Sequence, residues 1–137
     1  MEVAVYRRKV NYYETDQMGV VHHSNYIRYF EEARIDLMEK VGLPYADMEE
    51  NGLIIPVLSV ECHYGKPVLF GKDFEVHSRL VKFDGLKMEF VYEIWSEGQL
   101  CTTGNSKHCF LDKDMKPVRM KRVYPEIFQK MKELVEG

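Results

Sequence analysis

The chain has 137 residues, of which 45% are hydrophobic and 30% charged, and its formal net charge is −3 at pH 7. This length suits one domain with its own core, so a single domain is expected over residues 1–137, and the slightly acidic balance argues against a nucleic-acid binder. The three cysteines form no C-x-x-C pair, which favours a reducing compartment. The sequence has no apolar run long enough to span a membrane and no h-region of a signal peptide, so a cytoplasmic location without a membrane span is expected.

The first predicted elements are a strand and a long helix. Residues 4–13 are rich in Val and Tyr with charges between them, which predicts a strand. From Ser24 onward apolar residues recur at helical spacing, which predicts an amphipathic helix of about five turns. Ser24 or its neighbour can cap the start, and Gly42 followed by Pro44 ends the helix. Two i,i+4 ion pairs are expected on its solvent face: Arg28–Glu32 and Asp36–Lys40.

The rest of the chain reads as a short helix over residues 44–50, then strands and turns, then a helix from Pro125. The clearest strand is 86–96, where apolar and polar residues alternate at period two. Asp84-Gly85 is a dipeptide favoured by type I′ hairpins, and Gly98 marks a second turn. The predicted strands form an antiparallel meander: 53–64, 73–83, 86–96 and 100–111.

These elements predict an α+β fold. One amphipathic helix placed after the first of five antiparallel strands can bury its apolar stripe only against one face of the sheet. We therefore expect a twisted sheet that curls around the helix, with a C-terminal helix added. An open sheet edge invites pairing with another copy, so a homodimer with a continuous sheet is expected. Such dimers can also pair into a homotetramer.

Residues 15–26, TDQMGVVHHSNY, hold the candidate site. Asp16 supplies a carboxylate that can attack a carbonyl or activate water. The helix start supplies unpaired N–H groups and a dipole that favour an anion, and the backbone N–H of His23 is the candidate oxyanion donor. Gly19 allows a sharp turn and a close approach of substrate. The structural alternatives are a turn or cap role for Asp16 and a backbone hydrogen bond for the His23 side chain.

A metal site is the chemical alternative for the same stretch. Glu14, Asp16, His22 and His23 are all ligand types. Adjacent histidines point in different directions on a helix or a strand and rarely share one ion, so no metal or other cofactor is predicted. Glu61, on a predicted strand, is a second carboxylate that can be considered. The other histidines are interpreted as structural: His63, His77 and His108.

Several short stretches together resemble the hotdog-fold acyl-CoA thioesterases of the 4-hydroxybenzoyl-CoA thioesterase and YbgC type: Tyr12-Tyr13-Glu14-Thr15-Asp16, Gly19-Val20-Val21, His23, Tyr26 and Phe30-Glu31-Glu32-Ala33-Arg34. The resemblance implies a hotdog fold and hydrolysis of an acyl-CoA thioester without a serine or cysteine nucleophile. It assigns the catalytic carboxylate to Asp16 and the family's histidine to His23. His22 stands where relatives often have an aromatic residue, and Glu14 where many have Asp.

An acyl-CoA substrate would also need contacts along its length. Gly19, Val21 and Tyr26 are the candidates near the acyl group. Lys82 and Lys87 are the candidates for the CoA phosphates, because the family's nucleotide contacts come from this neighbourhood. The alternative function is a non-catalytic hotdog module that binds an acyl chain or an acyl carrier protein. Such a module has no need of a carboxylate that faces a helix start.

Overall fold

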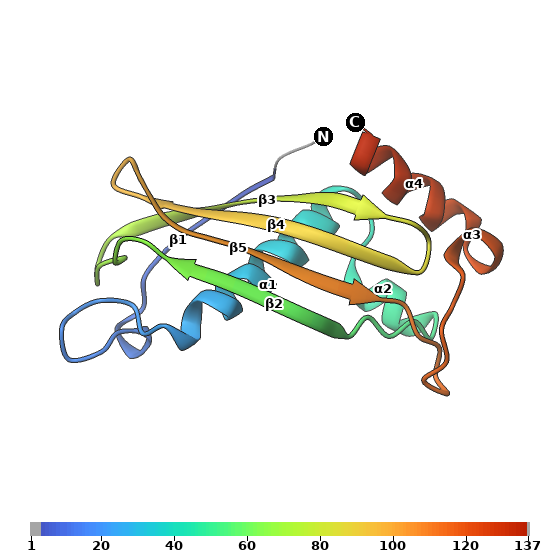
Figure 1. Cartoon of the computed structure of the whole chain (residues 1–137), viewed down its shortest axis with the longest axis horizontal. Coiled ribbons are helices and arrows are strands. Elements are labelled where there is room, and N and C mark those ends of the chain that lie inside the picture. The colour runs from blue at the N-terminus through green and yellow to red at the C-terminus, as the bar shows by residue number, and fades with distance from the viewer. Residues whose placement is uncertain (1–3, 137) are drawn as a thin grey trace.

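A computed structural model describes residues 4–136, in which a five-stranded antiparallel sheet curls around one long helix (Figure 1). The expected α+β hotdog architecture is confirmed. The strands are β1 (Ala4–Lys9), β2 (Val57–Tyr64), β3 (Asp73–Phe83), β4 (Lys87–Ser96) and β5 (Gln99–Cys109). The helices are the 3-10 helix η1 (Tyr12–Glu14), α1 (Ser24–Lys40), α2 (Tyr45–Glu50), α3 (Met120–Val123) and α4 (Pro125–Glu136).

The strand order β1-β3-β4-β5-β2 makes β1 and β2 the two edges of the sheet. Strands β3, β4 and β5 form the predicted meander, but placing residues 53–64 in it was wrong. Strand β2 pairs with β5, where Glu61 lies opposite Asn105. Between β2 and β3 the chain passes the start of α1, with Val21 N donating to Val68 O at 2.8 Å and Phe70 N to Gly19 O at 2.9 Å. The chain thus crosses from the edge strand β2 to β3, which lies beside the other edge strand β1, and passes the start of α1 on the way.

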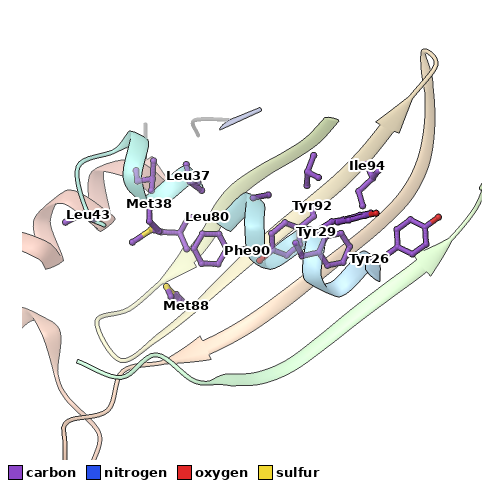
Figure 2. Close-up of a cluster of buried hydrophobic side chains, with 14 of the residues drawn as sticks. Tyr26, Tyr29, Leu37, Met38, Leu43, Leu80, Met88, Phe90, Tyr92 and Ile94 are labelled. Carbon is purple, nitrogen blue, oxygen red and sulfur yellow. The ribbon is translucent and has the colours of Figure 1, made fainter. Parts of the chain in front are cut away.

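Helix α1 packs its apolar side against the concave face of the sheet (Figure 2). Tyr29 and Phe30 are fully buried, and the Phe30 ring stacks on Tyr92 of β4 with centroids 4.4 Å apart. Gly104 on β5 makes this contact possible, because a Cβ there would lie 2.5 Å from the Phe30 ring. None of the helices within residues 4–136 is long and apolar enough to cross a membrane.

Local interactions explain where the elements depart from the expected boundaries. The strand expected over residues 4–13 ends at Lys9, because η1 follows and Glu14 Oε1 accepts a 2.8 Å hydrogen bond from Asn11 N. The expected Asp36–Lys40 pair forms at 2.7 Å. The Arg28–Glu32 pair was wrong, because Glu32 instead faces Arg8 of β1 at 2.8 Å.

The two hairpin turns differ from the expectation in one respect. Glu97 and Gly98 have φ angles of 53° and 72°, the pair of positive values that a type I′ turn requires. At Asp84-Gly85 only the glycine has a positive φ, of 91°. Asp84 Oδ1 accepts hydrogen bonds from Leu86 N at 2.9 Å and Lys87 N at 2.7 Å, so the Asp84 side chain stabilises this turn. The helix predicted from Pro125 is present as α4.

Candidate active site

The segment between η1 and α1 folds into a short closed loop. Thr15 and Val21 form an isolated bridge at its base, and Asp16 N donates to Val20 O at 2.9 Å. At the tip, Gly19 has a φ of 74°, a left-handed conformation that glycine adopts without strain. Asp16 Oδ1 accepts a hydrogen bond from Met18 N at 2.8 Å, which holds the carboxylate in one orientation and leaves Oδ2 available.

The start of α1 lies directly after this loop. His22 N donates to Glu14 O at 2.8 Å, and Ser24 N donates to His22 Nδ1 at 3.2 Å. His23 is the N-cap between them, and its own N–H has no hydrogen-bond acceptor among residues 4–136. A free N–H at a helix start is a site where negative charge is favoured. Asp16 directly follows one residue of the Thr15–Val21 bridge and His23 lies two residues after the other, so the bridge holds the loop that carries Asp16 beside the helix start.

Aromatic rings surround the helix start. His22 and His23 stack with ring centroids 4.2 Å apart, and Tyr64 of β2 approaches the His23 ring at 6.3 Å and the Tyr26 ring at 5.2 Å. Tyr64 OH also donates to His23 O at 3.4 Å. Sequence reasoning missed Tyr64, because its place at the end of an edge strand becomes visible only in the folded sheet.

Two of the expected substrate contacts are buried in the core. Tyr26 is 4% exposed and its hydroxyl accepts a 3.4 Å hydrogen bond from Val68 N, and Val21 is also 4% exposed. Burial raises the pKa of Tyr26 above its ordinary value, so its hydroxyl stays protonated. Both side chains therefore pack in the core under the loop and are not part of the exposed surface of the site. In contrast, Gly19 lies at the loop tip, with nothing within 4 Å of where a Cβ would stand.

Lys82 and Lys87 flank the β3–β4 turn, whereas the site loop adjoins the start of β3. These two places lie at opposite ends of the sheet (Figure 1). The 11 residues of β3 separate the two ends by roughly 30 Å at about 3.3 Å per residue. Within one chain these lysines therefore lie far from the loop, because a β-strand carries its two ends far apart, and their contact with the CoA phosphates stays a prediction.

The end of the sheet that holds these lysines has a cavity of its own. Its volume is about 650 Å³, and Leu58 of β2 lies on its wall together with Phe83 and Met88. Lys82, Lys87 and Lys107 also line it. Asp84 and Glu89 line it too, and Lys82 Nζ lies 3.8 Å from Glu89 Oε1, so the lining has a small excess of positive charge beside its apolar wall.

The other residues considered from the sequence lie away from the loop or are already paired. Glu61 is exposed on β2, and its nearest polar contact is Asn105 Nδ2 at 3.4 Å. Glu14 is buried and bonds Arg8, a cation that would oppose a metal ion at the same place. Within the part of the chain that the structure describes, no three His, Cys, Asp or Glu side chains form a group that could hold a metal.

Comparison with known proteins adds independent information. The family model described as "Thioesterase-like superfamily" matches residues 10–130. A Bacillus subtilis relative, YneP, whose name gives it provisionally as an acyl-CoA thioesterase, is 34% identical over 128 residues, or 92% of this chain and 93% of its own. The structure of a DHNA-CoA thioesterase from Staphylococcus aureus aligns with a TM-score of 0.93 and 35% identity, over 97% of this chain and 91% of that one. A second Staphylococcus aureus protein, solved in complex with CoA, shares the fold with a TM-score of 0.87 at 16% identity, over 98% of this chain and 85% of that one.

Proposed function

The chain belongs to the thioesterase-like superfamily and is a thioester hydrolase, and from this premise we propose that it hydrolyses an acyl-CoA to the free acid and coenzyme A with Asp16 as its catalytic carboxylate. One observation carries the proposal. A carboxylate on a closed loop precedes a helix whose first N–H, that of His23, has no acceptor within residues 4–136. A thioesterase needs these two functions, a group that attacks or activates water and a donor for the oxyanion.

Two routes lead to the same products. In one, Asp16 Oδ2 attacks the thioester carbonyl carbon, the carbonyl oxygen becomes negative beside the His23 N–H, and the C–S bond breaks to release the CoA thiolate. Water then hydrolyses the resulting anhydride. In the other route, Asp16 accepts a proton from a water molecule that attacks the same carbon. Both routes place the negative oxygen at the helix start, where the backbone donor and the helix dipole stabilise it.

We further propose that the working unit is a homodimer paired through β2. This edge strand is rich in exposed apolar side chains, with Val57, Leu58 and Tyr64 each more than half exposed. The other edge, β1, exposes Val5, Arg7 and Lys9, of which two are charged, and Lys40 Nζ already donates to the Val5 carbonyl at 2.8 Å. An open apolar edge is the one that favours pairing with another chain.

Antiparallel pairing of β2 with a second copy would place one end of each chain beside the opposite end of its partner. Tyr64, at one end of β2, contacts the helix start, and Leu58, at its other end, lines the lysine-rimmed cavity. Two antiparallel copies therefore bring the Asp16 loop of one chain towards the lysine cavity of the other. In this arrangement Lys82 and Lys87 of the second chain would hold the CoA phosphates. The likeness to a protein solved with CoA agrees with such a ligand. An acyl carrier protein also carries its acyl group through a thioester bond, and it is the second partner proposed for the same chemistry.

Thiol release from a panel of short-chain, medium-chain and aromatic acyl-CoA esters tests the activity. Turnover of at least one ester, well above that of the Asp16→Asn variant, is expected. Release no faster than in that variant across the panel would contradict the proposal. Light scattering tests the assembly, since one chain has a mass of 16.2 kDa and a dimer twice that mass. A particle of one chain at micromolar concentration would contradict pairing through β2.

A further inference from the structure

A buried carboxylate lies directly beneath the candidate site and takes no part in the proposed chemistry. Glu14, the last residue of η1, is 4% exposed. Its side chain bonds the Arg8 guanidinium through both oxygens, and Oε1 also accepts from Asn11 N at 2.8 Å. Its backbone oxygen accepts from His22 N at 2.8 Å and from Asn25 Nδ2 at 2.9 Å. Glu14 thus joins β1, the base of the loop and the start of α1.

Arg8 is itself held from several sides. Its Nε donates to Glu32 Oε1 of α1 at 2.8 Å. Its guanidinium lies 4.7 Å from the centre of the Tyr29 ring and 5.2 Å from that of Phe74, so both rings can stabilise the cation. A guanidinium fixed in this way presents its planar fork to Glu14 in one orientation.

We propose that Glu14 is a positioning residue, which acts through Arg8 to fix the loop that carries Asp16 and the helix start that carries the His23 N–H. The loop leaves Glu14 at Thr15 and returns to it at His22, whose N–H bonds the Glu14 carbonyl. Any tilt of Glu14 therefore moves both ends of the loop together. The inference rests on the proposed function for its catalytic consequence, but the structural anchoring does not depend on it.

The charge of Glu14 is the feature that makes this anchor strong. Burial alone would raise the pKa of the Glu14 carboxyl, but hydrogen bonds from Arg8 and the Asn11 N–H outweigh burial and hold that pKa below its usual value. A neutral amide of the same shape would turn N–H groups towards the guanidinium and lose the paired hydrogen bonds. The shorter carboxylate of aspartate keeps the charge and can still bond Arg8.

The consequence should appear in the chemical step more than in substrate binding. Misplacement of a reacting group by about 1 Å can lower a rate by about 10²-fold. The proposed CoA contacts lie on the other chain of the dimer, away from Glu14. We therefore expect Glu14→Gln to lower kcat by roughly ten- to a hundredfold and leave KM for the best acyl-CoA nearly unchanged.

A matched set of variants separates charge, shape and general stability. Glu14→Gln keeps the shape and removes the charge, whereas Glu14→Asp keeps the charge and changes the shape. Glu32→Gln is the control, because an amide oxygen at position 32 can still accept the Arg8 Nε–H, and Glu32 makes no hydrogen bond to residues 15–22 or to Glu14. The expected order of kcat is wild type and Glu32→Gln highest, Glu14→Asp next and Glu14→Gln lowest.

Hydrogen exchange followed by mass spectrometry supplies a readout that needs no substrate. In Glu14→Gln, exchange of the peptide that contains residues 15–22 should become faster, while that of β4 stays at the wild-type rate. Glu32→Gln should leave both unchanged. Wild-type kcat and loop exchange in Glu14→Gln would overturn the inference, and so would equal effects in Glu14→Gln and Glu32→Gln. If no chain hydrolyses any thioester, the proposed function fails, and the exchange measurement alone decides the anchoring.

Discussion

The two ends of the curved sheet carry different parts of one proposed reaction. At the start of α1, a closed loop holds Asp16, and the free donor there is a backbone N–H. At the β3–β4 turn, Lys82 and Lys87 flank a cavity of about 650 Å³. At the first end the carboxylate and the donor are held by backbone hydrogen bonds of the loop and the helix start. At the second end the charged groups are long lysine side chains beside an apolar wall.

This difference suggests how a small chain could contact both ends of a long substrate such as an acyl-CoA. The reacting carbonyl needs rigid groups within hydrogen-bond distance, and the loop end has these. The phosphates of CoA need only point charges at the protein surface, and the lysine end has these. Since roughly 30 Å of strand separates the two ends, one chain cannot place both on one acyl-CoA unless the ligand spans the sheet. A second chain, paired antiparallel through β2 as proposed, would remove the conflict.

The largest expected effect comes from the loop end. The Asp16→Asn variant should keep its fold and lose turnover by about 10²–10⁴-fold, because an amide can neither attack the carbonyl nor accept the proton of water. Thiol release and circular dichroism measure the two properties. Wild-type turnover in this variant would move the chemistry to another carboxylate, of which Glu61 on β2 is the first to examine.

An intermediate effect, on stability, is expected at the lysine end. His108 is fully buried beside that cavity, and its Nε2 lies 2.7 Å from Ser106 Oγ. Burial, together with the positive charge of Arg34, lowers the pKa of His108 from 6.5 to about 4. Between these values the unfolded chain binds a proton that the folded chain excludes. The free energy of unfolding should therefore fall as pH drops from 6.5 to 4, by on the order of 3 kcal/mol from this residue.

Urea unfolding at a series of pH values measures this dependence. The His108→Gln variant should show a flatter profile over the same window, whatever its stability at pH 7. His63→Gln is the matched control, because His63 is an exposed histidine on the neighbouring strand β2. Equal slopes in the wild type and His108→Gln would contradict the assignment.

The smallest effect is expected from the lysines. The Lys82→Ala/Lys87→Ala double variant should raise KM for acyl-CoA several-fold and leave kcat nearly intact, the pattern of lost uniform binding. Added salt should weaken binding in the wild type, since exposed charges are screened beyond about 8 Å at physiological ionic strength. Hydrolysis of a truncated thioester without the nucleotide should not change. Equal losses on both substrates would show that these lysines support the fold instead.

Local patterns in the sequence were enough to predict most of the secondary structure. The helical spacing from Ser24 and the alternation around Phe90 each reflect burial of one face, and α1 and β4 follow both closely. The loop that carries Asp16 was also predictable, because glycine and a helix start leave a local signature. The place of β2 was not, since pairing with β5 depends on how the sheet wraps around α1.

Side-chain partners distant in the sequence were the other part that could not be predicted. Glu32 was expected to pair with Arg28, four residues away, but it faces Arg8 on another element. The Arg8–Glu14 pair beneath the loop has no periodic or motif signal. The distance of Lys82 from the loop was not predictable for a related reason, since it depends on the full length of β3 and not on any local pattern.

Hybrid dimers test the central claim, that one site uses both chains, most directly. Two differently tagged chains are co-expressed, one with Asp16→Asn and the other with Lys82→Ala/Lys87→Ala, and the mixed dimer is purified. If the lysines act across the interface, one of its two sites combines an intact Asp16 with intact lysines, so the hybrid should show the wild-type KM for acyl-CoA. If the lysines act within their own chain, no site is complete, and the raised KM of the lysine variant would persist and contradict the account.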